Sequence, residues 1–477
     1  MDITSLTAVE LGKKIKAKEI SVVEAVKASI AQIEKVEKDV NSFVTLDKEG
    51  ALKRAEEVQK MIDDGTLLSP LAGVPVAIKD NMCTKGTRTT CSSKILENFV
   101  PTFTSEAVLN LEKAGAVIIG KTNMDEFAMG SSNENSGIKP VSNVWDTDRV
   151  PGGSSGGSAT AVAAGEAPVA LGTDTGGSVR QPAALSGVVG IKPTYGRVSR
   201  YGITAYSSSL DQCGPITQNV EDAAILYDII SGHDPMDSTS ANIDYEAVTP
   251  KLNADKKLTI AVIDNFVSQA SPAIQKGFEK AVKALEDAGH KIIHKNMLDT
   301  QKIVSTYYIV ATAEASANLA RFDGVRFGNR KGEAGLKDMY VQTKSQGFGH
   351  EVQKRIMLGS FVLSSGYYDA YYIKAQKVRH LIKDEYAAIF SEADLILSPV
   401  APTTAPKFGS FKTSLEMYLS DIYTISINLA GLPAISLPVD KDEDGMPVGL
   451  QFIAKAYDEQ TLFDGALSLE KAINYIK

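Results

Sequence analysis

The segment from Arg149 to Arg180, RVPGGSSGGSATAVAAGEAPVALGTDTGGSVR, constrains this chain more than any other part of its sequence. It holds two glycine–serine clusters, one around Ser154 and one around Ser178, joined by small residues. Glycine lets a backbone turn and approach a ligand where a Cβ would clash, and serine carries a hydroxyl that can donate, accept or attack. An earlier apolar run, LAGVPVAI, ends at Lys79. A lysine and two serines in such surroundings indicate hydrolytic or transfer chemistry without histidine.

The composition is that of a globular protein with an acidic balance. The chain has 477 residues, of which 43% are hydrophobic, and a formal net charge of −8. A chain that binds nucleic acid normally has a basic face. Because this chain is acidic, any nucleic-acid substrate is expected to be bound mainly by a partner. No apolar run is long enough to span a bilayer. The three cysteines form no CxxC pair, which indicates a reducing cytoplasm. The five histidines form no HExxH motif, so a metal site is not expected.

Alternating helix and strand patterns predict an α/β fold with one large mixed sheet flanked by helices. We expect a single domain over 1–477, with an N-terminal helical segment at 1–60. A polar, turn-rich stretch at 232–257 indicates a boundary, so an insertion or cap lobe is expected at about 246–390. Its later part, 300–390, is rich in helix-forming residues and tyrosines. Strand patterns occur at 116–120, 168–175, 258–263, 393–402, 432–439 and 447–456, and Ser21 has the pattern of a helix N-cap.

Three familiar catalytic signatures fail on this sequence. VAIK at Val76–Lys79 matches a kinase motif, but the glycine-rich loop, HRD and DFG motifs that a kinase also needs are missing from the sequence. Gly152–Gly156 satisfies the G-x-S-x-G pattern of a nucleophile elbow, yet the preceding WDTDRVPG is a poor strand. Neither serine cluster continues into the Gly-Lys-Ser/Thr of a phosphate-binding loop.

A serine–serine–lysine arrangement uses all three features together. Lysine acts as a base near neutral pH only where burial lowers its pKa, and apolar residues precede Lys79. Ser178 would attack, with Ser154 relaying its proton to the lysine. The alternative is that both clusters are only anion-binding turns and Lys79 only a strand end. Backbone N–H groups expected to form the oxyanion hole are those of Thr175, Gly176, Gly177 and Ser178.

The same motifs closely resemble the amidase signature family. The family's lysine lies in a motif like GVPVAIKDN, and its two serines lie in a region like GGSSGGS…GTDTGGSVR, both present here. The resemblance implies an amidase-signature fold and a catalytic triad of Lys79, Ser154 and Ser178, the middle serine being held by a cis peptide. It implies that an amide is cleaved through an acyl-enzyme.

Further segments resemble one branch of that family, the glutamine-hydrolysing subunits of bacterial tRNA-dependent amidotransferases. These segments are 306–328, 347–379 and 417–439. The resemblance implies that ammonia from glutamine passes to a tRNA-binding kinase subunit in a heterotrimer that also contains a small third subunit. No cofactor is expected on this chain, because it has no recognisable nucleotide fingerprint. ATP and Mg²⁺ are expected at the partner, which contacts the tRNA.

Free glutamine needs a cation for its α-carboxylate and an anion for its α-ammonium. Arg355 could hold the carboxylate in a bidentate fork, Asp421 could receive the ammonium, and Tyr307 could add a hydroxyl contact; these positions match the family's glutamine-binding residues. Their structural alternatives are a helix-face charge, a helix cap and core packing, respectively. A stand-alone amidase acting on small or peptide amides, which would not need both charges, is the main alternative function. A catalytically silent scaffold is a second.

Overall fold

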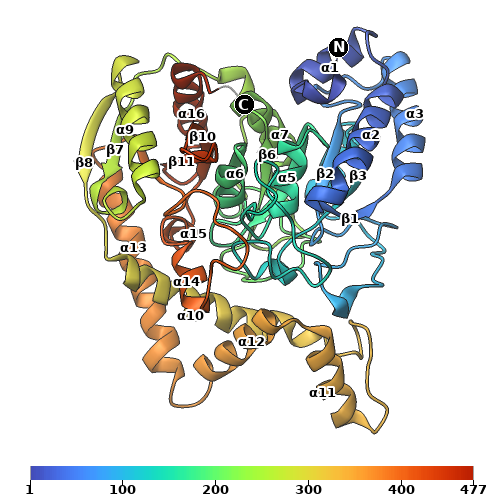
Figure 1. The fold of residues 1–477 in the computed structure, drawn as a ribbon, viewed down its shortest axis with the longest axis vertical. Coiled ribbons are helices and arrows are strands. Elements are labelled where there is room, and N and C mark those ends of the chain that lie inside the picture. The colour runs from blue at the N-terminus through green and yellow to red at the C-terminus, as the bar shows by residue number, and fades with distance from the viewer. Residues whose placement is uncertain (1, 476–477) are drawn as a thin grey trace.

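The strands of the chain form one mixed sheet, as predicted. A computed structural model describes residues 2–475, and within them the eleven-stranded sheet has the order β1-β3-β2-β4-β6-β5-β10-β11-β9-β7-β8. The strands are β1 (Phe43–Leu46), β2 (Pro75–Lys79), β3 (Val117–Thr122), β4 (Val169–Asp174), β5 (Val189–Lys192), β6 (Gln212–Thr217), β7 (Thr259–Ile263), β8 (Lys291–Lys295), β9 (Leu395–Pro399), β10 (Ala434–Lys441) and β11 (Pro447–Ala454). Figure 1 shows helices on both sides of this sheet.

The position of the site follows from the direction of the strands. β2 runs parallel to both β3 and β4, so the carboxyl ends of these three strands meet at one edge of the sheet. Every residue of β2 and β4 is buried. Strands covered on both faces have continuous apolar runs rather than alternating patterns, which explains the run that ends at Lys79.

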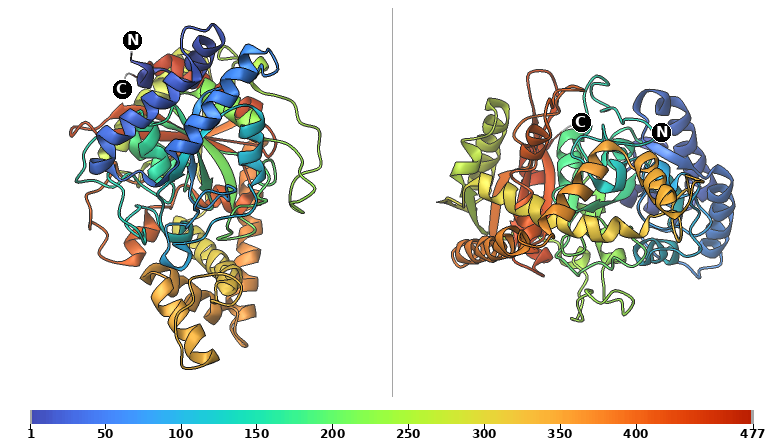
Figure 2. Two further views of the ribbon diagram at one scale, coloured as in Figure 1. Left: turned by 90° about the vertical axis from the view of Figure 1, so that its right-hand side faces the viewer. Right: turned by 90° about the horizontal axis from the view of Figure 1, so that it is seen from below.

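The principal helices pack around the sheet or project from it (Figures 1 and 2). They are α1 (Ala8–Lys16), α2 (Val22–Val40), α3 (Lys48–Asp63), α4 (Glu106–Lys113), α5 (Gly156–Ala163), α6 (Arg180–Ser186), α7 (Val220–Ile230), α8 (Asp264–Val267), α9 (Pro272–Asp287), α10 (Thr300–Asn318), α11 (Leu336–Gly347), α12 (His350–Val362), α13 (Lys374–Phe390), α14 (Ser414–Leu419), α15 (Ile425–Ala430) and α16 (Glu459–Ile473). No helix within residues 2–475 combines the length and apolarity needed to cross a membrane.

The N-terminal region is helical but also contains a strand. Ser21 is the N-cap of α2 and forms a capping box with Glu24, as its sequence pattern indicates. Within the predicted helical segment 1–60, however, β1 pairs antiparallel with β3. The helices of this segment pack on the sheet through a shared apolar core. This part of the chain is therefore an integral layer of the fold.

The predicted lobe at about 246–390 divides into two structural parts. Its first part supplies β7 and β8, which pair parallel to each other and extend the sheet beyond β9. Its second part, α10 to α13, contains the helices that project from the body in Figures 1 and 2. The projecting part thus begins near Thr300, later than the predicted boundary, because the intervening strand–helix–strand segment joins the main sheet.

Candidate active site

Lys79 ends β2 and lies fully buried beside both residues of a tandem serine pair. Its Nζ is 2.8 Å from Ser154 Oγ and 2.8 Å from Ser155 Oγ, and it donates to the Thr173 carbonyl at 3.2 Å. A neutral amine has one lone pair and two N–H groups, so one serine hydroxyl can donate to Nζ while the other contacts remain. The predicted contact between Lys79 and Ser154 is present in the structure.

The surroundings of Lys79 favour its neutral form. Burial lowers the pKa of Lys79 to about 7, although the carboxylates of Asp125, Asp174 and Asp211 act in the opposite direction. Desolvation disfavours an ammonium ion, and here it outweighs the attraction of the three acids. A substantial fraction of Lys79 is therefore able to accept a proton near neutral pH.

The turn that carries Ser154 is held by contacts on both sides. The Gly153–Ser154 peptide is cis, the Gly153 N–H donates to Gln181 Oε1 at 2.9 Å, and the Asp125 N–H donates to the Ser154 carbonyl at 3.2 Å. A Cβ at position 153 would clash with Asp125 Oδ2, so glycine is required there. No strand leads into Ser154 within the described residues, in keeping with the rejection of the elbow motif.

Ser155 is a site residue that was not predicted from the sequence. Besides facing Lys79, its hydroxyl donates to the Thr173 carbonyl at 3.2 Å, and its N–H donates to the Ser178 carbonyl at 3.1 Å. Ser155 therefore ties together the lysine, β4 and the second serine turn. Its place beside Ser154 in the SSGG run was the available signal, but two consecutive side chains ordinarily point in different directions.

The second turn follows β4 directly and carries the buried Ser178. The Gly177 N–H donates to Asp174 Oδ1 at 2.8 Å, so this predicted oxyanion donor is already committed. The N–H groups of Thr175, Gly176 and Ser178 have no acceptor within residues 2–475. Three of the four predicted donors are thus free to receive an oxyanion, while the fourth holds the turn.

A fully buried ion pair between Arg180 and Asp174 stabilises this turn. Arg180 donates to Asp174 from Nε at 3.0 Å and from Nη2 at 3.1 Å, and it also reaches Gln451 and Asn428 at 2.9 and 2.6 Å. Burial alone would raise the pKa of the Asp174 carboxyl, but the neighbouring guanidinium holds that pKa well below its usual range. Asp174 is therefore a permanent anion that can hold N–H groups of the turn.

Arg355 lies on the inner side of α12 with one part of its guanidinium unpaired. Its Nε donates to Glu351 Oε1 at 2.7 Å and its Nη1 to the Tyr206 hydroxyl at 2.8 Å. Nη2 is buried without a partner within the described residues. The guanidinium carbon lies 5.3 Å from the ring centres of both Tyr308 and Tyr418. A buried, unpaired N–H pair is the donor that a substrate carboxylate would satisfy.

Asp421 lies close to Tyr308, whose ring also lies near Arg355. Its Oδ2 accepts from Ser131 Oγ at 2.8 Å and from the Tyr308 hydroxyl at 2.9 Å. Burial raises the pKa of Asp421 to about 7, against the lowering effect of these hydrogen bonds and of Arg355. Because Tyr308 contacts both charged residues, the fold brings the two predicted glutamine-binding residues into one subsite.

The Tyr307 hydroxyl lies beside the turn that carries Ser178. A Cβ at Gly176 would lie 2.5 Å from the Tyr307 hydroxyl, so this hydroxyl lies against the Ser178 turn. Its neighbour Tyr308 contacts Asp421 instead. Tyr307 was predicted from the sequence, whereas Tyr308, Ser131 and Glu351 were not; the tandem tyrosines on α10 were the signal for Tyr308.

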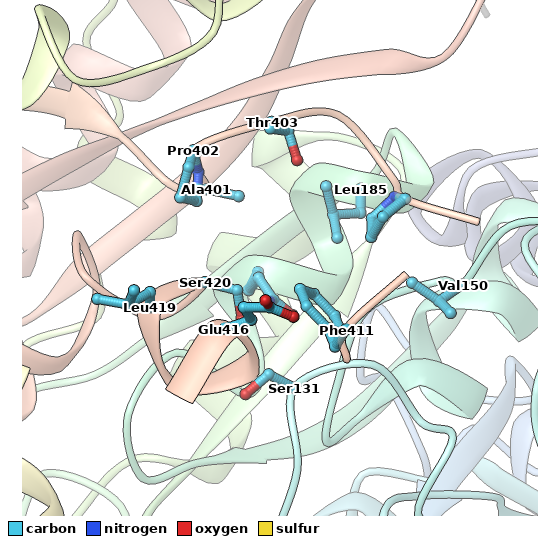
Figure 3. Close-up of a pocket in the computed structure, with 12 residues that line it drawn as sticks. Ser131, Val150, Leu185, Ala401, Pro402, Thr403, Phe411, Glu416, Leu419 and Ser420 are labelled. Atoms are coloured by element: carbon cyan, nitrogen blue, oxygen red, sulfur yellow. The ribbon is translucent and has the colours of Figure 1, made fainter. Parts of the chain in front are cut away.

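A cavity of about 280 Å³ adjoins this subsite. Ser131, the partner of Asp421, lies on its wall, as does Gln181, which holds Gly153. Figure 3 shows its other side formed by the segment 401–420, with Phe411 lying between Val150 and Glu416. The walls of this cavity are mostly apolar, and Glu416 contributes a carboxylate to them.

The fold and this arrangement of lysine and serines define a class of protein. The family model described as Amidase matches residues 24–463, and the chain belongs to that family. The peptide amidase of Stenotrophomonas maltophilia has the same fold, with a TM-score of 0.85 and 28% identity, covering 99% of this chain and 98% of that one.

Particular relatives narrow the comparison within the family. The chain is 84% identical over 405 residues to the A subunit of glutamyl-tRNA(Gln) amidotransferase from Aliarcobacter butzleri, covering 85% of this chain and 89% of the relative. It is 56% identical to the corresponding subunit of Agathobacter rectalis, covering 99% and 94%. The crystal structure of the same subunit from Thermotoga maritima matches with a TM-score of 0.82 at 40% identity, covering 100% and 97%.

Proposed function

We propose that this chain is the glutamine-hydrolysing subunit of a glutamyl-tRNA(Gln) amidotransferase, a carbon–nitrogen ligase with glutamine as amido donor. It would supply ammonia for the ATP-dependent conversion of misacylated Glu-tRNA(Gln) to Gln-tRNA(Gln) in protein synthesis. One observation carries the proposal: the buried Lys79–Ser154 pair lies in the same fold as a subsite that holds Arg355 and Asp421 together around Tyr308. The similarity to three amidotransferase subunits of that kind supports it.

The proposed chemistry begins with the γ-carboxamide of glutamine. Ser178 attacks the carbonyl carbon while neutral Lys79, acting through Ser154, removes the proton of the attacking hydroxyl. The N–H groups of Thr175, Gly176 and Ser178 stabilise the tetrahedral oxyanion. The protonated lysine returns the proton to the leaving ammonia, and water then hydrolyses the γ-glutamyl ester to glutamate by the same relay.

Substrate selection in the proposal uses the two ends of free glutamine. The unpaired Nη2 of Arg355 would receive the α-carboxylate, and ionised Asp421 would receive the α-ammonium. Glu351 already pairs with Arg355, so the arginine is oriented and charge-balanced before substrate arrives. Tyr307 would line the reacting end of the substrate, beside the Ser178 turn.

The rest of the reaction is assigned to other subunits. We propose a heterotrimer in which a tRNA-binding kinase subunit carries ATP and Mg²⁺ and a small third subunit completes the assembly. The acidic charge of this chain fits contact with tRNA made mainly through the kinase subunit. The proposal places the enzyme in the cytoplasm, where the chain's free cysteines, Cys83, Cys91 and Cys213, would stay reduced.

Ammonia release from glutamine tests the proposal, measured for the purified chain alone and with its candidate partner subunits. We expect wild-type activity to require or be raised by the partners, and Ser178→Ala to lose at least about 10³-fold in kcat. Unchanged activity in Ser178→Ala would overturn the triad.

A matched pair of variants separates this function from a stand-alone amidase. Arg355→Ala should mainly raise the KM for glutamine and leave the hydrolysis of an amide without a carboxylate unaffected, while Arg355→Lys should be intermediate. If Arg355→Ala left glutamine kinetics intact and the chain hydrolysed simple amides well without partners, the stand-alone function would replace the proposal.

A further inference from the structure

Thr424 joins the Asp421 segment to the turn of the nucleophile. It is fully buried, and its Oγ1 donates to the Gly176 carbonyl at 2.5 Å. Its N–H donates to the Asp421 carbonyl at 3.0 Å, so Thr424 and Asp421 belong to one turn immediately before α15. Thr424 lies in the segment 417–439, but the sequence alone predicts no role for it.

The peptide that Thr424 contacts is held from its other side as well. The Gly177 N–H, on the same peptide as the Gly176 carbonyl, donates to Asp174 Oδ1 at 2.8 Å. In a trans peptide the C=O and N–H point in opposite directions. The hydroxyl and the carboxylate therefore hold this peptide at both ends, in one of its two possible orientations.

These two contacts favour the observed orientation of the Gly176–Gly177 peptide over the opposite one. Turning the peptide over would point the Gly176 carbonyl oxygen at the Asp174 carboxylate and would lose both hydrogen bonds. The backbone itself offers little resistance, since both residues are glycine and Gly177 already has a φ of 130°. The side chains of Thr424 and Asp174 thus stabilise one orientation of a peptide whose two glycines restrain it little.

We infer that Thr424 is a positioning residue for the acyl-transfer step. By fixing the Gly176–Gly177 peptide, its hydroxyl holds the adjoining N–H groups of Gly176 and Ser178 in the arrangement that receives the oxyanion. Thr424 and Asp421 share one turn, so this hydrogen bond also links the turn of the nucleophile to the segment that carries Asp421. This inference rests on the proposed function for its substrate.

The packing around Thr424 supplies matched variants. Its Cβ and Cγ2 lie 2.8 and 3.1 Å from where a Cβ on Gly177 would be, so the side chain fills the space beside the turn. Thr424→Val keeps that shape and removes the hydroxyl. Thr424→Ser keeps the hydroxyl and removes the methyl group, and Thr424→Ala removes both.

The assembled complex with each variant is assayed for ammonia release from glutamine. We expect Thr424→Val to lower kcat about 10- to 100-fold, less than or similar to the loss of a direct oxyanion donor, with KM changed less than about twofold. Thr424→Ser should keep kcat within about threefold of wild type. Should Thr424→Val fail to fold, the comparison of Thr424→Ala with Thr424→Ser asks the same question on a smaller side chain.

Two outcomes would overturn the inference. One is a normal kcat in both variants that lack the hydroxyl. The other concerns glutamine binding, measured by calorimetry in the inactive Ser178→Ala variant with and without Thr424→Val. A weaker affinity in the double variant would contradict the inference, because a residue that acts only in the chemical step leaves ground-state binding unchanged. Failure of wild type to hydrolyse glutamine would instead refute the proposed function, and the same kcat comparison would then be made with a simple amide that wild type hydrolyses.

Discussion

At the scale of single residues, the site depends on two ionisable side chains whose burial moves them towards their neutral forms. Burial lowers the pKa of Lys79 to about 7 and raises the pKa of Asp421 to about 7. Catalysis as proposed requires both to be deprotonated, Lys79 as the base and Asp421 as the ligand of an ammonium. The same protonation range therefore governs two different steps.

The pH dependence of the kinetics should separate these two groups. The rate constant kcat/KM reports the free enzyme, so its logarithm should rise with a slope approaching two below pH of about 7. Bound glutamine places an ammonium beside Asp421 and keeps it ionised, so the logarithm of kcat should rise with a slope of one. Steady-state kinetics across pH 5.5 to 8.5 measures both, and a slope of one in both parameters would exclude a role for Asp421 ionisation.

Individual residues were predictable from the sequence to different degrees. The triad positions occur in continuous motifs, and the structure places Lys79 beside Ser154 as expected. Tyr308, Ser131 and Thr424 were not predictable, because their roles arise where α10, a loop and the turn before α15 meet. The Gly177 N–H was also not predictable: it donates to Asp174, and this hydrogen bond depends on the conformation of the turn.

At the scale of elements, the helices and strands are tied together by buried polar caps rather than by packing alone. The carboxylate of Asp222 on α7 accepts from the N–H groups of Ala8 and Val9 at 2.9 and 3.0 Å, so it caps α1 from a distant part of the chain. Free N–H groups in the first turn of a helix need such acceptors. This contact fastens the first helix to the body of the protein.

Removing that cap should weaken the N-terminal layer without affecting the chemistry. Asp222→Ala leaves two buried N–H groups without an acceptor, which we expect to cost about 1–3 kcal/mol in the free energy of unfolding. Chemical denaturation monitored by circular dichroism measures this cost, with kcat for glutamine as the control. A variant as stable as wild type would show that α1 is held by its apolar contacts alone.

Elements with strong local patterns were predicted well. The capping box at Ser21 and the apolar runs of β2, β7 and β11 determine their own structure from nearby residues. β1 was missed because its four residues carry no clear alternation and are stabilised by pairing with β3. The helical part at 300–390 was predicted from its helix-forming residues. The segment before it was assigned to the same lobe, although β7 and β8 join the main sheet, since a strand joins a sheet through partners distant in the sequence.

At the scale of the whole molecule, the sheet and the projecting helices contribute different residues to the site. The parallel strands β2 and β4 bring Lys79 and Asp174 to one edge of the sheet, and the turns beside them carry the serines. The helices α10 and α12 then place Tyr308 and Arg355 near that edge, so the region predicted as a cap supplies residues of the proposed glutamine subsite. No local pattern in the sequence could indicate this contact between distant segments.

The central claim is that Ser178 is the nucleophile served by Lys79 through Ser154. It is tested most directly by quenching the complex with acid during glutamine turnover and mapping the covalent adduct by peptide mass spectrometry. We expect one γ-glutamyl group on Ser178, which is absent in Ser178→Ala and strongly reduced in Lys79→Ala. A γ-glutamyl group on Ser154, on Ser155 or on any residue other than Ser178 would contradict the account.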